Sequence, residues 1–179
     1  VGDGRTFLRE TDHTYDLIVL DAYRSDRVPQ HLTTVEFMAL AKSRLDADGA
    51  VLANVISARQ GPDSVFYRAQ YRTMDRVFPR VYSFPTSESG ALQNIELLAT
   101  NDSELYSQAA FETRNRQRTI GLNLSEAISH YRANVSVGDA PLLRDGDAPV
   151  DALLARQVDT DYVVERTDDN ESATATARP

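Results

Sequence analysis

The chain has 179 residues, of which 41% are hydrophobic and 26% are charged, so it can form one ordinary domain with a sizeable core, and wholesale disorder and fibrous repeats are excluded. It carries 27 acidic and 19 basic residues, for a formal net charge of −8, so unspecific binding to nucleic acid is not expected. The absence of cysteine excludes disulfides, thiolate nucleophiles and zinc–cysteine sites.

No apolar run approaches the roughly 20 residues that cross a bilayer, and no secretory signal opens the chain. We therefore expect a soluble, cytoplasmic protein. Lys42 is the only lysine, and the acidic residues are weighted toward aspartate. An acidic protein of this kind suits a halophile, but a GC-rich genome would give much the same bias, and both explanations stay open.

The first predicted element is a strand. Residues 15–21 form the apolar run Tyr-Asp-Leu-Ile-Val-Leu-Asp, which ends in the carboxylate of Asp21. A continuous rather than alternating run predicts a strand covered on both faces, as in a parallel sheet. Thr33 and Glu36 then have the spacing of a capping box before residues with helical periodicity, and Gly49 is placed to end that helix.

The same pattern recurs along the chain. Residues 50–56 predict a second buried strand, and a second helix follows until Pro79 stops it. One face of this helix carries large apolar side chains, which we interpret as core: Tyr67, Tyr71, Met74 and Phe78. A strand–helix–strand–helix order predicts a parallel sheet with right-handed crossovers.

The remaining elements are shorter. Two strands are predicted at residues 80–84 and 94–100. Asp102 with Ser103 predicts the cap of a third helix that reaches Arg114, and residues 123–131 predict a fourth helix. A brief helix is expected at residues 150–156.

The best candidate for chemistry is Asp21, because ligands of open parallel sheets bind beyond the carboxyl ends of the strands. Its carboxylate can accept a proton from an amine or hold a substrate cation, but it can equally cap the loop or pair with Arg24 or Arg27. Asp3 can accept hydrogen bonds from an adenine amino group or a ribose, or it can be a simple turn aspartate beside Gly4.

Other kinds of site are not expected. His13, His31 and His130 are far apart in the sequence and lack the spacing of metal ligands, so no metal site is predicted. We interpret His31 as a loop or capping residue rather than as a base. The sequence also contains neither a G-x-S-x-G nucleophile elbow nor a Walker loop.

Five motifs follow one another along the chain, and their combined order carries a resemblance: GDGR at 2–5, YDLIVLDAY at 15–23, VPQHLT at 28–33, NIELLAT at 94–100 and LRDGDAPVD at 143–151. Together they resemble the spermidine synthase-like (polyamine aminopropyltransferase) family over about residues 1–156. The resemblance implies an α/β fold: the C-terminal portion of a Rossmann-like methyltransferase/spermidine synthase fold, with a mostly parallel sheet, an antiparallel last strand and flanking helices.

The resemblance also implies a domain organisation. Residues 1–137 would form a partial Rossmann-like domain, and residues 138–166 would be a C-terminal extension of it. Residues 167–179 are polar, with alternating alanine and threonine, and are expected to be a disordered tail.

The residue roles that the resemblance implies are specific. Asp3 and Gly4 would bind the nucleoside of decarboxylated S-adenosylmethionine, or of S-adenosylmethionine, used as a co-substrate. Asp21 would orient or deprotonate the attacking amine, and Tyr23 and Asp26 would bind the acceptor. The implied reaction transfers an aminopropyl group to putrescine in polyamine biosynthesis, with no metal and no tightly bound cofactor.

Two departures from the family pattern modify this expectation. Aminopropyltransferases carry a second aspartate three positions after the first, where this chain has Arg24, a cation that would repel a diamine unless Asp26 compensates. Ahead of the segment that begins at Gly2, the family has a strand, a glycine-rich loop and a second strand that ends in an acidic residue, and this sequence contains none of these. We therefore expect a truncated chain that is inactive alone.

The open strand edge left by such a truncation predicts self-association or a partner chain that covers it. Two other functions stay open. One is a non-catalytic module that binds a polyamine or nucleoside, and the other is a methyltransferase in which Arg24 and Arg27 engage an anionic acceptor. Hydrophobic spans upstream in a parent protein would place the domain on the cytoplasmic face of a membrane.

Overall fold

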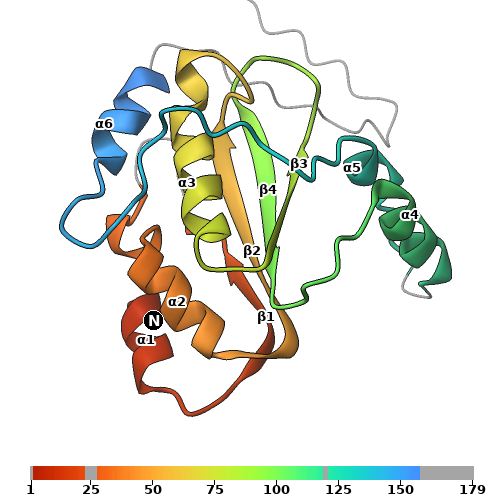
Figure 1. Cartoon of the computed structure of the whole chain (residues 1–179), viewed down its shortest axis with the longest axis horizontal. Coiled ribbons are helices and arrows are strands. Elements are labelled where there is room, and N and C mark those ends of the chain that lie inside the picture. The colour runs from red at the N-terminus through yellow and green to blue at the C-terminus, as the bar shows by residue number, and fades with distance from the viewer. Residues whose placement is uncertain (1, 23–27, 119–120, 158–179) are drawn as a thin grey trace, which may run out of the picture.

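The computed structural model describes residues 2–22, 28–118 and 121–157, which form an α/β fold with a four-stranded mixed sheet (Figure 1). The strands are β1 (Tyr15–Leu20), β2 (Leu45–Ser57), β3 (Arg80–Pro85) and β4 (Gln93–Thr100). Their order in the sheet is β1-β2-β4-β3. β1 is parallel to β2, and β4 is antiparallel to both β2 and β3. The predicted α/β fold with an antiparallel last strand is confirmed, and the described sheet is mixed, because only one of its three pairings, β1 with β2, is parallel.

Six helices are described: α1 (Gly4–Glu10), α2 (Val35–Ser43), α3 (Val65–Asp75), α4 (Gln108–Gln117), α5 (Ser125–Ser129) and α6 (Val150–Leu154). Short 3₁₀ turns occur at Gln30–Leu32, Pro62–Ser64 and Ala155–Gln157. Figure 1 shows α2 and α3 in front of the sheet and α4 and α5 beside β3. Within the described residues, no helix has both the length and the apolar character needed to cross a membrane.

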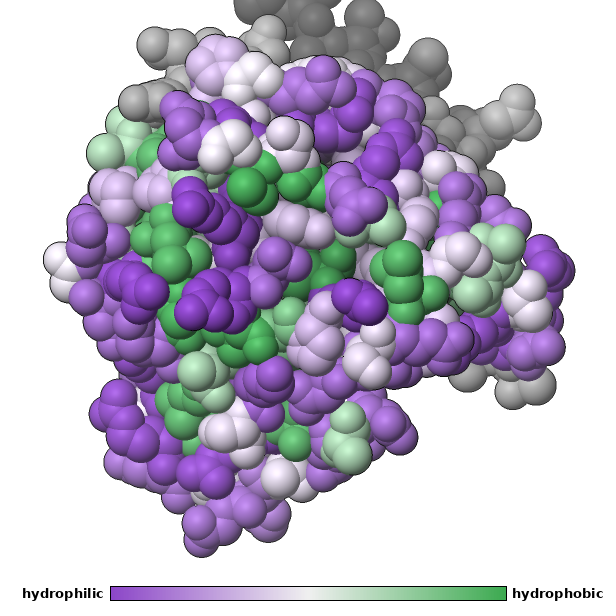
Figure 2. Space-filling view, viewed as in Figure 1, coloured by the Kyte–Doolittle hydropathy of each residue, from purple (hydrophilic) through white to green (hydrophobic). Residues whose placement is uncertain are grey.

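One face of the sheet is fully covered. Val51, Ala53 and Val55 of β2 have no exposed surface, and neither do Ile95 and Leu97 of β4. These side chains belong to the main hydrophobic core, to which α2 and α3 also contribute large residues: Phe37, Met38, Phe66, Tyr67 and Met74. The outer surface of this side is mostly hydrophilic, with apolar residues showing between polar ones (Figure 2). The predicted core face of the helix before Pro79 is thereby confirmed.

The opposite face is covered unevenly. Near β3 it is packed by an aromatic cluster whose ring centroids lie 5.2–6.5 Å apart: Tyr82, Phe84, Tyr106, Phe111 and Tyr131. Near β1 it is open, with Leu17 and Val19 exposed to 50% and 56%. No described strand pairs with the outer edge of β1. The prediction that this strand is covered on both faces is therefore wrong for the described residues, because only Ile18 and Leu20 are buried.

The first helix, α1, was not predicted, because the segment around Gly4 reads as a turn. Asp3 is its N-cap, and the side chain accepts a hydrogen bond from the backbone N–H of Thr6. Only Leu8 of this helix is buried, so its sequence carries no apolar period that would indicate a helix.

The boundaries of α2 also differ from the prediction. The N-cap is Thr34 rather than Thr33, and Glu36 accepts a hydrogen bond from the backbone of Asp145 instead of closing a capping box. Gly49 does not end the helix, because it lies inside β2. A Cβ atom at this position would come within 2.9 Å of the Tyr15 carbonyl oxygen, so close strand packing requires glycine here.

The third predicted helix begins later than expected. Ser107 caps α4, whereas Asp102 accepts hydrogen bonds from the Glu104 backbone and the Tyr106 hydroxyl. The fourth helix is confirmed as the short α5, and the brief helix as α6 with the turn that follows it. The expected tail at residues 167–179 lies outside the described residues.

Candidate functional site

A cleft of about 550 Å³ wraps around the open edge of β1. Its lining includes Asp3 and Gly4 from the start of α1, Asp21 from the end of β1, and His31 from the turn that precedes α2. The structure therefore brings together three residues that the sequence marked as candidates, Asp3, Gly4 and Asp21, although two of them lie almost 20 positions from the third. Ile18, Leu20 and other apolar residues make the floor of the cleft.

Asp21 follows the last residue of β1, and its side chain is exposed. Asn54 of β2 donates a hydrogen bond from Nδ2 to the Oδ1 atom of Asp21 at 3.1 Å. This contact crosses two parallel strands, since Leu20 is paired in register with Ala53. Asn54 thus orients the Asp21 carboxylate, and Asp21 lines the cleft.

Glu96 extends this polar row to a third strand, because it pairs with Asn54 across β2 and β4. Burial raises the pKa of the Glu96 carboxyl, and the negative charge of Asp21 raises it further. Sequence reasoning missed both Asn54 and Glu96. The available signal was a polar residue at an alternate position within two otherwise apolar strands, on the face that carries Leu52 and Leu98.

Asp3 is held firmly at the rim of the cleft. Its Oδ1 atom accepts the Thr6 backbone N–H at 2.8 Å, and its Oδ2 atom lies 2.5 Å from Nε2 of His31. The hydrogen bond from Thr6 and, next, the contact with His31 lower the pKa of Asp3 to about 2. The carboxylate is therefore ionised at any pH near neutrality, and its partner His31 lies in the turn that precedes α2.

The motif at residues 143–151 contacts the first two helices from a distant part of the sequence. Arg5 forms a bidentate ion pair with Asp145, with Nη–Oδ distances of 2.7 and 2.5 Å. The Thr34 hydroxyl donates to the same carboxylate at 2.8 Å. Asp145 thus joins the start of α1 to the N-cap of α2.

Some predicted site residues cannot be placed. Tyr23 and Asp26, expected to bind the acceptor, and Arg24 lie outside the described residues. Among residues 2–22, 28–118 and 121–157, no group of three or more histidine, aspartate or glutamate side chains is arranged to hold a metal ion.

No family model matches the chain. Two curated relatives do. The chain is 32% identical over 114 residues to a polyamine aminopropyltransferase of Vibrio vulnificus (strain CMCP6), which covers 60% of this chain and 36% of that protein. It is 25% identical over 171 residues to a probable polyamine aminopropyl transferase of Bifidobacterium longum (strain NCC 2705), and this match covers 88% of this chain and 38% of that protein. The chain therefore spans less than two fifths of the length of these relatives.

Solved structures share the fold. A probable spermidine synthase from Corynebacterium glutamicum ATCC 13032 matches with a TM-score of 0.61 and 20% identity, over 83% of this chain and 54% of that one. Spermidine synthase from Thermotoga maritima matches with a TM-score of 0.52 and 21% identity, over 75% and 46%. A spermidine synthase in complex with the transition-state analogue AdoDATO has a TM-score of 0.51 and 22% identity, over 75% and 45%.

Proposed function

We propose that this chain is a member of the spermidine synthase-like family, which its relatives and structural neighbours support, and that it contributes residues to an aminopropyltransferase site. The reaction would move an aminopropyl group from decarboxylated S-adenosylmethionine to an amine such as putrescine. The observation that carries this proposal is the placement of Asp21, an exposed strand-end carboxylate oriented by Asn54, in one cleft with Asp3 and Gly4.

Asp21 would act as the proton acceptor. The nitrogen lone pair of the amine attacks the methylene carbon beside the sulfonium, and the carbon–sulfur bond breaks with its electrons going to sulfur. An alkyl amine is mostly protonated near neutral pH, so it must lose a proton before it can attack. The Asp21 carboxylate can take that proton by a direct hydrogen bond, and Asn54 keeps it aimed at the cleft.

The nucleoside of the co-substrate would lie at the Asp3 side of the cleft. The Asp3 carboxylate is ionised, and each of its oxygens can accept more than one hydrogen bond. It can therefore cap α1 and still accept from an adenine amino group or a ribose hydroxyl. A Cβ atom at Gly4 would meet nothing within 4 Å, so the space beside this backbone is open to a ligand. Tyr23 and Asp26 remain proposed contacts of the acceptor.

We further propose that additional polypeptide completes this cleft and that the chain by itself is inactive. Leu17 and Val19 present apolar surface beside the cleft, and the outer edge of β1 has free strand-pairing groups in the described sheet. The curated relatives are more than twice as long as the segment that they share with this chain. A further segment of a longer protein, a second copy or a partner chain could supply this cover.

The test is a transfer assay with decarboxylated S-adenosylmethionine and putrescine. We would compare the 179-residue chain with a version extended upstream in the same reading frame, and we expect product only from the longer protein. In that protein, Asp21→Asn should lower turnover about 100-fold or more. Asp16→Asn, at the other end of the same strand, is the matched control and should leave turnover unchanged.

Each result has a defined consequence. An unchanged rate for Asp21→Asn would reduce this residue to a loop cap. Methyl transfer from S-adenosylmethionine, without aminopropyl transfer from its decarboxylated form, would replace the proposed reaction by a methyltransferase reaction. Full activity of the 179-residue chain would contradict the need for further polypeptide and leave the reaction itself supported.

A further inference from the structure

A second cavity, of about 570 Å³, lies beyond the carboxyl end of β2 and shares no lining residue with the cleft around β1. Three arginines line it: Arg59 follows β2, Arg68 lies on α3, and Arg132 follows α5. No carboxylate is among the described lining residues. In a chain with a net charge of −8, three guanidinium groups around one hollow create a local region of positive potential.

Each guanidinium group has uncharged partners in addition to a carboxylate. Arg68 donates from Nε to the Ser64 hydroxyl at 3.1 Å and from Nη1 to the Val137 carbonyl at 3.2 Å. Arg132 donates to two backbone carbonyls at 2.7 and 3.1 Å, and Arg59 donates to a backbone carbonyl of the β3–β4 loop at 3.0 Å. Gln60 also lines the cavity, and with its amide oxygen turned toward Arg59 it accepts from both Nη atoms of that residue, at 2.8 and 2.9 Å. These contacts use only part of each guanidinium group, so the remaining N–H groups are available to another acceptor.

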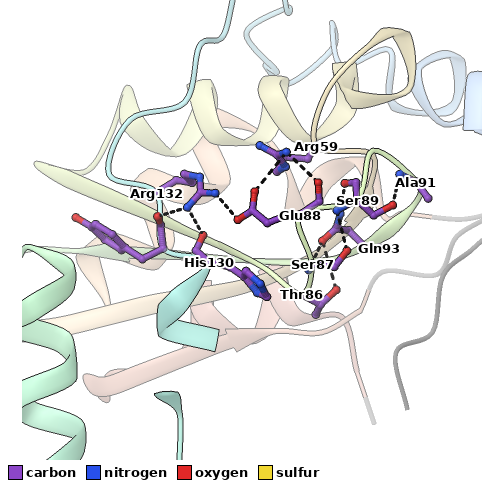
Figure 3. A network of polar contacts seen from close by, with 10 residues as sticks. Arg59, Thr86, Ser87, Glu88, Ser89, Ala91, Gln93, His130 and Arg132 are labelled. Carbon is purple, nitrogen blue, oxygen red and sulfur yellow. Dashed lines mark hydrogen bonds and ion pairs between the residues drawn. The ribbon is translucent and has the colours of Figure 1, made fainter. Parts of the chain in front are cut away.

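The carboxylates near the cavity do not balance its positive charge. Glu88 lies between Arg59 and Arg132 and forms ion pairs with both (Figure 3), at 3.5 Å from Arg59. Asp139 lies 3.5 Å from Arg68, but its side chain is 97% exposed, so water screens this pair. Two carboxylates therefore face three guanidinium groups. In addition, Nε of Arg59 is buried and has no hydrogen-bond partner among the described residues.

We propose that this cavity binds an oxyanion, namely the phosphate or carboxylate group of a small molecule. Guanidinium groups match such oxyanions with two parallel N–H···O bonds, and a bound oxyanion would supply the missing negative charge. α3 begins in the wall of the cavity, so its N-terminal end adds favourable partial charge. This proposal does not depend on the aminopropyl-transfer function.

The cavity and Asp21 both lie beyond the carboxyl ends of the parallel strands β1 and β2. β1 and β2 are parallel, and β2 continues for four residues beyond Ala53, the partner of Leu20. Four strand residues span about 13 Å. A small molecule held in this cavity would therefore lie beyond the end of β2, past the level at which Asp21 follows β1. The cavity favours a negatively charged group, whereas the cleft that contains Asp21 favours a positively charged one.

Binding can be measured directly on the 179-residue chain at low ionic strength. We would titrate inorganic phosphate and, separately, malonate, and follow the arginine Nε–Hε signals by NMR together with the heat of binding. We expect saturable binding of at least one anion, and its identity distinguishes a phosphate site from a carboxylate site. Arg59→Gln and Arg68→Gln should weaken that binding at least tenfold. Arg76→Gln, outside the cavity at the other end of α3, is the matched control and should not change it.

Glu88→Gln provides a test in the opposite direction. Removal of this carboxylate frees Arg59 and Arg132 from an internal competitor, so oxyanion binding should tighten severalfold, a result that partial unfolding cannot produce. Three results would overturn the proposal: no saturable binding of phosphate or malonate, weaker binding by Glu88→Gln, or equal loss in Arg76→Gln and Arg59→Gln.

Discussion

The two faces of the sheet are made by alternate residues of the same strands, yet they differ in what covers them. On one face, Val55 and Leu97 are fully buried in the core to which α2 and α3 contribute. On the other face, Leu17 and Val19 are equally apolar but half exposed. The comparison teaches that hydrophobic character in these strands specifies a surface that needs cover, and does not specify where the cover comes from.

The open face is also where the candidate chemistry lies. Its β3 side is closed by the aromatic cluster, and its β1 side leads to the polar row of Asp21, Asn54 and Glu96. The covered face, in contrast, is mostly apolar core, with a few buried polar side chains such as Ser83 and Gln93. Proton transfer needs carboxylates that a ligand can reach, so the proposed site and the uncovered surface occupy the same region.

The largest expected effect tests whether apolar side chains on the two faces contribute differently to the free energy of unfolding. Leu97→Ala should lower the free energy of unfolding by about 3 kcal/mol, because it leaves a cavity in the covered core. Leu17→Ala removes the same atoms from the open face and should cost less than about 0.5 kcal/mol. Urea unfolding of both variants, at a protein concentration low enough to keep the chain monomeric, measures the difference, and equal losses would show that the open face is covered within the monomer.

The next prediction concerns association through the open face. We expect the chain to self-associate, and Val19→Lys should weaken this association about tenfold, since a charged side chain on an edge strand opposes strand addition. Analytical ultracentrifugation over a concentration series measures the effect. Leu122→Lys introduces the same side chain at a similarly exposed site and should have no effect. A monomer at every concentration would contradict the prediction.

A smaller effect on stability is expected at Asp3, which caps α1 and lines the cleft. Because its folded pKa is lowered to about 2 from 3.8, Asp3 stabilises the fold above about pH 4, and this contribution is lost as the pH falls toward 2. Asp3→Ala should therefore lower the Tm by a few degrees at pH 7 and by much less near pH 2. Asp12→Ala serves as the exposed control. A Tm loss that does not depend on pH would contradict the role of the ionised carboxylate.

The smallest effect concerns Glu96. Burial and Asp21 raise its folded pKa, so the folded state is favoured while Glu96 is protonated, and this advantage is lost as the pH rises through the raised pKa. Glu96→Gln should thus stabilise the chain at pH 7 by at most about 1 kcal/mol, since water partly screens the site, and should have no effect at pH 3. Glu104→Gln is the exposed control. Destabilisation at pH 7 would indicate that a cation compensates Glu96.

Much of the fold was predictable because its strands carry a strong local signal. The runs at residues 15–20 and 50–56 are apolar and rich in branched residues, and both are strands. Helix ends were less predictable. Ser103 and Ser107 are chemically equal as caps, and Ser107 caps α4 because the Asp102–Tyr106 contact holds the intervening segment outside the helix. Such a choice depends on side-chain contacts that a propensity cannot express.

The candidate site was predictable only in part, for a similar reason. Asp21 follows from its position at a strand end, a purely local feature. Asn54 and Glu96 join it only through the strand register, which pairs Leu20 with Ala53 and Asn54 with Glu96. The pairing of His31 with Asp3 likewise requires the 3₁₀ turn to lie against the start of α1.

The sequence by itself determined the strands, the strand-end carboxylate and the resemblance to a family, because each is encoded in residues that are neighbours along the chain. The tertiary structure alone decided which face of the sheet is covered, and it gathered Arg59, Arg68 and Arg132 around one cavity. The physical reason is that alternation assigns side chains to two faces, whereas burial and local charge depend on segments that are distant in sequence and meet only when the chain folds.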